Sequence, residues 1–337
     1  SRGLGDVYKR QHSQSNLQVL TPESSLQKNL TIMYAWGRTM TLQQLKYIVM
    51  VAECKNITDA AEKLFISQPS LTAAIQSVEK EMGITAFTRT NKGVELTRDG
   101  EALLSYARQI LEQMDVMTEH FKGERHLKPH FSVSCQHYSF AVNAFVDVIR
   151  EYDADAYSFT LRETQTYEII DDVSVGRSEI GILYLSEQNE AVLGKLIAKS
   201  DLRFQELFEA KPHVFISNRH PLAARKKLTV QDLLPYPYLV FEQGQHNSFY
   251  FSEEFLSMLE LPKNIMVRDR ATLFNLLIGL NGFTVCSGVL DAELNGENII
   301  AKPLISDCTM RIGVVTRKDA ALSRYGVSYM EALKRHI

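Results

Sequence analysis

The stretch NITDAAEKLFISQPSLTAAIQSVEKEMG, residues 56–83, decides the fold of the N-terminal region. Its apolar residues recur at helical spacing, and the pattern breaks once at Ile66. Helical spacing then resumes at Leu71, Ile75, Val78 and Met82, which are expected to face a core. Asn56 is a good N-cap for the helix before the break, and Ser67 for the helix after it. Pro69 falls in the first turn of the later helix, where its missing N–H removes no intrahelical bond. The break is therefore predicted to be a tight turn between two short helices, a helix-turn-helix unit.

The residues around this stretch predict a further helix and a β-hairpin. Apolar side chains mark one face of the preceding helix, at Leu42, Leu45, Ile48 or Val49, and Ala52. After it, AFTRTNKGVELT (86–97) predicts two short strands around Asn91-Lys92-Gly93, a hairpin turn signal. A basic hairpin beside a helix-turn-helix is a wing, and we expect Arg89 and Lys92 to contact DNA phosphates.

A helix-turn-helix places its second helix in the major groove of DNA, with N-terminal side chains at the base edges. We therefore expect DNA contacts at the start of that helix, from Ser67, Gln68, Pro69, Ser70 and Thr72. Gln68 suits a bidentate pair with adenine, and the Thr72 methyl suits contact with a thymine methyl. Ser67 and Gln68 have a simpler interpretation, in which they cap the helix and contact backbone. For Ser67 this interpretation is favoured, because serine is a strong cap.

Thr97 is placed to cap a long helix predicted over residues 98–126. Apolar residues follow at spacings of 4, 3, 4, 3 and 4, at Leu103, Ala107, Ile110, Met114, Met117 and Phe121. This short heptad seam predicts pairing with another helix, most simply that of a second copy of the chain. The alternative is a helix that packs only on its own domain.

The pattern changes after GERHLKP (123–129), which is interpreted as a hinge. Strand and helix patterns then alternate, which predicts an α/β domain with largely parallel sheets. The predicted strands are HFSVSC (130–135), YSFTLRET (157–164), EIGILYL (179–185), HVFIS (213–217), YLVF (238–241), FTVC (283–286) and RIGVVT (311–316), with helices SFAVNAFVDVIREY (139–152) and YEIIDDVSVG (167–176) among them.

These motifs resemble those of the LysR-type transcriptional regulators. The resemblance is most specific in MTLQQLKYIVMVAE (40–53), in ITDAAEKLFISQPSLTAAIQSVEKEMG (57–83) and in AFTRTNKGVELTRDGEALL (86–104). It continues more weakly in SNRHPLA (217–223), LTVQDLLPYPYLVFEQG (228–244) and GLNGFTVCSG (279–288).

The resemblance implies an N-terminal winged helix-turn-helix (40–97), a dimerising linker helix (98–126) and a C-terminal α/β effector domain (127–337). That last domain is expected to resemble a periplasmic binding protein, with two subdomains joined by two crossing strands. The first would hold residues 127–205 and 308–337, and the second residues 206–307. The expected partners are double-stranded promoter DNA, a small-molecule effector in the cleft, further copies of the chain in a dimer or tetramer, and RNA polymerase.

The DNA-binding region departs from the family pattern in charge. The family often carries a basic residue where Ala73 stands, a polar one at Ala74 and an arginine at Asp59. Between Met40 and His126 there are ten Lys plus Arg against twelve Asp plus Glu, a net charge of −2. Because phosphate contacts supply much of DNA affinity, we expect a shallow salt dependence. The cations expected to gather on the DNA side are Lys46, Lys55, Arg89 and Lys92. The alternative function is a small-molecule-binding protein with a weakened DNA-binding domain.

Ligands of such α/β folds bind near the carboxyl ends of strands and the N-termini of helices. The predicted effector-binding residues are Ser134, Cys135, Gln136, His137, Thr164, Tyr184, Phe241 and Glu242. Backbone N–H groups at the helix starts suit a carboxylate or another anion. Glu242 either opposes an anion or pairs with a cationic group, so both ligand charges stay open.

Other functions find little support in the sequence. Four separated cysteines form no metal-ligand spacing and favour a reduced, cytoplasmic chain, and Cys135 suits a buried thiol better than a redox centre. The histidines at 120, 126 and 130 are expected to be solvated, and no enzyme motif, metal site or cofactor is predicted.

No apolar stretch approaches the ~20 residues that would span a membrane. Residues 1–39 lack a clear period, and Met40 is a candidate for the native start, with a disordered or non-native leader before it.

Overall fold

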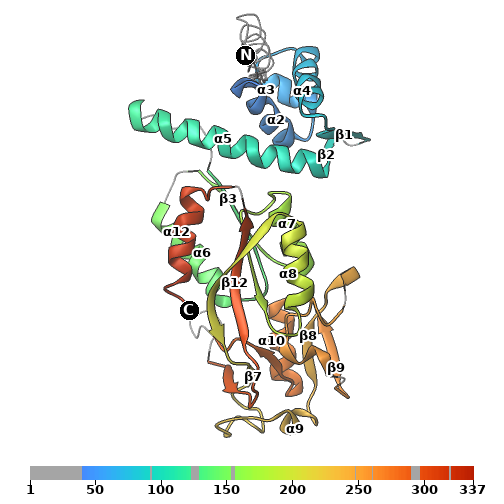
Figure 1. Cartoon of the computed structure of the whole chain (residues 1–337), viewed down its shortest axis with the longest axis vertical. Helices are drawn as coiled ribbons and strands as arrows, with labels where there is room; N and C mark the ends of the chain where they lie inside the picture. Colours follow the sequence, from blue (N-terminus) through green and yellow to red (C-terminus); the bar gives the residue numbers. More distant parts are fainter. Residues whose placement is uncertain are drawn as a thin grey trace, which may run out of the picture.

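Figure 1 shows the computed structural model, which describes residues 40–91, 93–122, 129–152, 156–246, 248–259, 261–289, 297–318 and 320–337. The predictions for residues 1–39, for Lys92 and for most of the hinge at 123–129 lie outside these residues. Among the described helices, none combines the length and apolar character needed to span a membrane.

Three helices and a hairpin form the N-terminal domain: α2 (Leu42–Cys54), α3 (Ile57–Lys63), α4 (Gln68–Met82), β1 (Phe87–Thr90) and β2 (Gly93–Leu96). Both predicted caps are confirmed. The Asn56 side chain accepts from the backbone N–H of Thr58, and the Ser67 hydroxyl accepts from that of Ser70. Helices α3 and α4 therefore begin where the sequence predicts.

The apolar faces of these helices meet in one core. Ile48 of α2, Ala60 and Ala61 of α3, and Leu71 and Val78 of α4 are buried together. The prediction was wrong for two residues of the apolar faces. Leu42 and Met82 lie at helix ends, and their side chains are 38% and 43% exposed. The core thus comes from the middle turns of each helix.

The glycine at position 100 joins this domain to the next helix. A Cβ atom on Gly100 would lie 2.0 Å from the Ala86 carbonyl oxygen, so only glycine fits without a shift. The Thr97 hydroxyl caps the next helix by accepting a hydrogen bond of 2.9 Å from the Gly100 N–H. The Leu-Thr-x-x-Gly pattern is therefore a packing requirement at the start of α5 (Arg98–Lys122).

Helix α5 lies between the DNA-binding domain and the rest of the chain (Figure 1). Its predicted seam divides into two parts. Leu103 and Ala107 are buried within their own domain, Ala107 in a cluster with Leu45 of α2. The remaining seam members are exposed in the single chain: Ile110, Met114, Met117 and Phe121.

A five-stranded sheet follows, in the order β4 (Ser158–Glu163), β3 (His130–Cys135), β5 (Ile180–Leu185), β12 (Met310–Arg317) and β6 (Leu202–Ala210). Alternate residues of β5 face opposite layers. Ile182 and Tyr184 pack with α6 (Ser139–Tyr152) and α12 (Arg324–Leu333), while Leu183 and Leu185 pack with α7 (Thr166–Ser174) and α8 (Glu190–Lys199). The sheet is thus covered on both faces, which explains its fully apolar strand (Figure 1).

The second part of the effector domain is built around smaller sheets. Strands β10 (Thr284–Cys286), β7 (His213–Ser217) and β11 (Ile299–Pro303) pair antiparallel, and β8 (Tyr238–Phe241) pairs parallel with β9 (Asn264–Val267). Helices α9 (Val230–Leu233) and α10 (Arg270–Leu280) and the short 3-10 helices at Gly244–His246 and Phe255–Met258 complete it. The chain passes between the two parts twice, after β6 and before β12.

The prediction of largely parallel sheets was wrong in part. Strands β3, β4 and β5 are parallel, but β12 runs antiparallel to both β5 and β6. The reason is the chain path, because β12 enters the sheet on the return from the second part. The α/β class itself and each named strand are confirmed.

Candidate DNA interface and effector cleft

The N-terminal turn of α4 carries an exposed polar surface. Gln68, Pro69 and Ser70 are exposed, and Thr72 is half-buried beside the exposed Ala73. The Ser67 hydroxyl lies 2.7 Å from that of Ser70, in addition to its bond with the Ser70 N–H. Ser67 is therefore engaged in capping, whereas the Gln68 side chain is exposed and the Thr72 side chain is half-buried at the same end of the helix.

Cations around this surface are few among the described residues. Arg89 is exposed on β1 of the wing, and Lys55 is exposed at the end of α2. The expectation that Lys46 joins them was wrong, since Lys46 lines a cavity of about 700 Å³ between α2, α5 and the effector domain. Arg98 also faces that domain, with its guanidinium 2.8 Å from the Asp171 carboxylate. In the part of the chain that the structure describes, the net acidic charge is thus not offset by a cluster of cations at the start of α4.

A cavity of about 770 Å³ opens between the two parts of the effector domain. Three predicted residues line it, namely His137, Thr164 and Glu242. The other lining residues are Arg162, Glu163, Gln165, Tyr167, Glu168, Asp171, Asp172, Arg177, Gly244, Gln245, His246 and Arg268. Both cationic and anionic side chains therefore line this cavity.

Four predicted effector-binding residues lie behind the cavity wall instead. Ser134, Gln136 and Tyr184 are buried and are not among the residues that line this cavity, and Cys135 is buried as well, as expected of a small thiol. The Gln136 side chain donates to the Thr166 hydroxyl at 2.7 Å and accepts from the Tyr184 N–H at 3.1 Å. Burial also raises the pKa of the Cys135 thiol well above its usual value, which keeps it from acting as a reactive thiolate.

His137 lies at the end of β3 and joins the two parts of the domain. Its ring stacks on Phe241 with centroids 3.6 Å apart, and its Nδ1 lies 2.8 Å from a Glu253 carboxylate oxygen. Burial lowers the pKa of His137, but the facing Glu253 carboxylate outweighs that effect, and the pKa is raised. Phe241 therefore supports His137 by stacking, without itself lining the cavity.

Two ion pairs at the cavity edge were not expected. Glu242 pairs with Arg268, and Glu163 pairs with Arg270 at the start of α10. The negative charge of Glu242 is therefore partly offset by Arg268, and both signs of ligand charge stay open. No sequence motif marks these arginines, because their partners lie far away in the chain.

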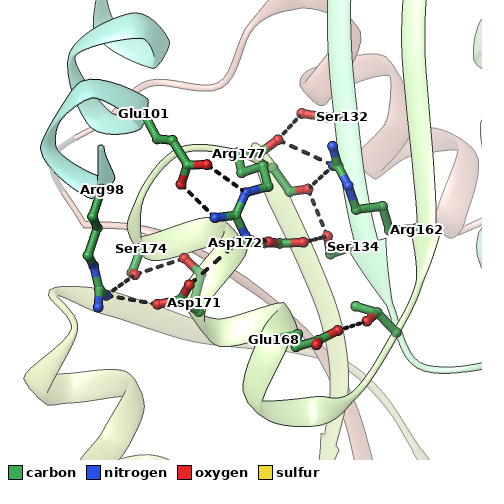
Figure 2. A network of polar contacts seen from close by, with 12 residues as sticks. Arg98, Glu101, Ser132, Ser134, Arg162, Glu168, Asp171, Asp172, Ser174 and Arg177 are labelled. Atoms are coloured by element: carbon green, nitrogen blue, oxygen red, sulfur yellow. Dashed lines mark hydrogen bonds and ion pairs between the residues drawn. The ribbon is translucent and has the colours of Figure 1, made fainter. Parts of the chain in front are cut away.

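Figure 2 shows a polar network that leads from the cavity to the linker helix. Arg177 forms ion pairs with the buried Asp172 and, at 2.5 Å, with Glu101 of α5. Asp172 also accepts a hydrogen bond of 2.6 Å from the Ser134 hydroxyl. Ser134 thus holds a residue of the cavity wall in place, which is a different role from the ligand contact predicted for it.

The comparisons with known proteins agree with this arrangement. The family profile described as a bacterial regulatory helix-turn-helix protein of the lysR family matches residues 42–101. The profile described as the LysR substrate binding domain matches residues 130–337. Together they span the helix-turn-helix, the wing and both parts of the effector domain.

Individual relatives extend over most of the chain. The HTH-type transcriptional regulator AlsR of Bacillus subtilis is 27% identical over 249 residues, covering 72% of this chain and 77% of its own. The dual regulator OxyR of Escherichia coli is 25% identical over 297 residues, covering 85% and 92%. A solved structure of a full-length OxyR variant from Pseudomonas aeruginosa has the same fold, with a TM-score of 0.58 at 20% identity, covering 88% and 95%. The chain therefore belongs to the LysR family of DNA-binding transcriptional regulators.

Proposed function

We propose that this chain binds promoter DNA through the start of α4 and the wing, and responds to a small molecule in the cleft of its effector domain. The observation that carries the proposal is the exposed, polar first turn of α4, where Gln68, Ser70 and Thr72 are free of the apolar core. Side chains at that position reach base edges when such a helix enters the major groove. Arg89 and Lys92 would add phosphate contacts from the wing.

The proposed working form is a dimer or tetramer in the cytoplasm. The exposed apolar row on α5, formed by Ile110, Met114, Met117 and Phe121, supports pairing of two linker helices. Two copies would present two α4 helices to successive major grooves. The proposed units are residues 40–97 for DNA binding, 98–126 for pairing and 127–337 for sensing. The sensing unit would divide into one subdomain of residues 127–205 plus 308–337 and another of residues 206–307. RNA polymerase is a further proposed partner.

The proposed sensing site is the cavity lined by His137, Thr164 and Glu242, together with Arg162 and Arg177. Its connection to DNA binding would run through Arg177, which contacts Glu101 of α5 as well as the cavity wall. A ligand that draws Arg177 into the cavity would weaken its hold on α5 and change the angle between the two linked DNA-binding domains.

A reporter experiment tests this function. The region upstream of the gene would be fused to a reporter and measured in cells with the wild-type chain, with Gln68→Ala and without the chain. We expect reporter output to change with the wild-type chain and to return toward the chain-free level with Gln68→Ala. Identical output in all three would contradict regulation through this surface.

A second candidate is a small-molecule-binding protein with a weakened DNA-binding domain. It is favoured by the net charge of −2 between Met40 and His126, and by the orientation of Lys46 and Arg98 toward the effector domain. It predicts similar weak affinity for the upstream DNA and for a scrambled duplex. The regulator predicts a clear preference for the former.

A further inference from the structure

Two backbone N–H groups at the floor of the cleft already have acceptors from the second part of the domain. The N–H of His137, just after β3, donates to a Glu253 carboxylate oxygen at 3.0 Å. The N–H of Thr166, the first residue of α7, donates to the Gln243 amide oxygen at 3.0 Å. These are the kinds of donor that a carboxylate ligand would use at strand ends and helix starts.

The surroundings of Glu253 are those of a bound carboxylate. Its side chain is only 7% exposed, and the same oxygen that accepts from the His137 N–H lies 2.8 Å from Nδ1 of the His137 ring. The Gln243 amide nitrogen lies 3.4 Å from its other oxygen. Three donors from two segments of the chain therefore converge on one carboxylate, which is nearly buried.

Contacts beside Glu253 join the same two parts of the domain. Glu163 at the end of β4 pairs with Arg270 of α10, and the Tyr167 ring of α7 stacks on His246 with centroids 3.7 Å apart. The open cavity of about 770 Å³ lies beyond His137, toward Tyr167 and Arg268. Glu253 is buried against His137, which lines the cavity, and we call its site the inner end of the cleft and the open cavity the outer end.

We propose that Glu253 is a built-in ligand, which occupies a carboxylate site at the inner end of the cleft and holds the two parts together without an effector. The inference rests on the proposed function in that it takes this cleft as the sensing site. The site has the chemistry to accept any small monocarboxylate once the Glu253 side chain is removed. A natural effector then binds the outer cavity beside Glu253, where Tyr167, Arg162 and Arg268 are exposed to it.

Chemical rescue tests this proposal directly. Glu253→Ala removes Cγ, Cδ and both carboxylate oxygens, which together have the size and charge of an acetate ion. Thermal unfolding of the full chain would be followed in sodium acetate and in sodium chloride at equal ionic strength. We expect the Tm of Glu253→Ala to be lower than wild type in chloride and to rise by about 3 to 5 °C with acetate, saturably.

Two further variants control for general salt effects. Glu190→Ala removes a carboxylate that pairs with Arg311 and lines neither cavity, and we expect its Tm to be the same in both salts. The double variant Glu253→Ala/His137→Ala lacks the ring donor and should lose most of the acetate response. Wild type, whose site is occupied, should show no response.

The proposal is overturned if acetate raises the Tm of Glu253→Ala no more than that of wild type or Glu190→Ala. If Glu253→Ala fails to fold in chloride, folded protein should be recovered in acetate. Absence of recovery, while the isosteric Glu253→Gln folds, would also overturn it. Thermal unfolding is measured without DNA. The acetate result therefore does not depend on whether the chain binds promoter DNA, and the two proposals can fail separately.

Discussion

Arg177 and Glu101 connect the effector domain to the linker helix through an ion pair of 2.5 Å. Glu101 lies in the first turn of α5, and Arg177 follows α7 and lines the cavity (Figure 2). The same guanidinium pairs with Asp172, whose side chain is 4% exposed. One side chain is therefore in contact with both the proposed sensing site and the helix that carries the DNA-binding domain.

Replacing Arg177 should lower stability more than replacing Glu101. Arg177→Ala leaves Asp172 as a buried carboxylate whose remaining side-chain donor, among the described residues, is the Ser134 hydroxyl. It should lower the free energy of unfolding by about 2 to 3 kcal/mol. Glu101→Ala breaks a partly exposed pair and should cost less than about 1 kcal/mol. Urea unfolding of both variants measures the difference. Equal effects would show that Asp172 does not depend on Arg177.

The salt dependence of DNA binding should be shallow. With few cations at the DNA side, we expect a slope of log K against log salt of about 3 to 5 in magnitude, where more basic relatives with 6 to 10 phosphate contacts give about 6 to 9. Arg89→Ala should reduce the slope by about 1 per site. Arg225→Ala, which removes an arginine paired with Asp232 in the second part of the effector domain, is the matched control and should leave it unchanged. A steep slope would contradict the proposed small electrostatic footprint.

The exposed row of α5 should hold two chains together. Met117 is 48% exposed in the single chain, and Met117→Glu should weaken self-association by about 100-fold by placing a charge in an apolar contact. Val327→Glu on α12 introduces the same charge at a residue that is 49% exposed, and should leave self-association unchanged. Sedimentation velocity of both variants is the measurement. If Met117→Glu and Val327→Glu both sediment like wild type, the helices pair elsewhere.

Stability should fall as the pH rises from about 5 to 9. Burial, followed by the charge of Glu253, raises the pKa of Glu254 from its usual 4.5 to about 8. Between those values the folded state binds more protons than the unfolded state, so the free energy of unfolding decreases with pH. The raised pKa of His137 acts in the same direction, because its stabilisation is complete below the unfolded value and is lost above the folded one.

Glu254→Gln should make this pH profile flatter. Its amide keeps the size of the protonated carboxyl, which accepts from the Phe241 N–H and the Ser252 hydroxyl. Urea unfolding at intervals of pH checks the prediction, with Glu242→Gln as a control at the outer cavity. Other groups should account for the slope that remains in Glu254→Gln, among them His137, which also faces Glu163 and Arg270, and Glu179, whose pKa is raised by burial. An unchanged slope would exclude Glu254 as its source.

The DNA-binding domain is predictable from the sequence because its determinants are local. Asn56 and Ser67 each bond to a backbone N–H two or three residues later, so both caps are visible as short motifs. The apolar residues of α4 repeat every three or four positions, and Leu71, Ile75 and Val78 are buried as expected. Met82 departs from the pattern because α4 ends there, before Gly83 takes a left-handed conformation.

The cleft is less predictable, since its partners are distant in the chain. Glu101 and Arg177 are 76 residues apart, and His137 and Glu253 are 116 apart, so no periodic pattern indicates either pair. The predicted strand ends do indicate which edge of the sheet faces the cavity, since His137 and Thr164 follow two of these strands and both line it. They do not indicate which side chains turn into the core, and Gln136 proved to be bonded to Tyr184 behind the wall.

The most direct test of the central claim is a titration of the full chain with the DNA upstream of its gene, against a scrambled duplex at physiological salt. We predict that wild type prefers the upstream DNA by about 1,000-fold or more. Thr72→Ala and Gln68→Ala should each reduce that preference by about 5- to 100-fold, while Ser77→Ala, an exposed serine further along α4, should not change it. Equal binding of both duplexes by wild type, or an undiminished preference in Thr72→Ala and Gln68→Ala, would contradict it.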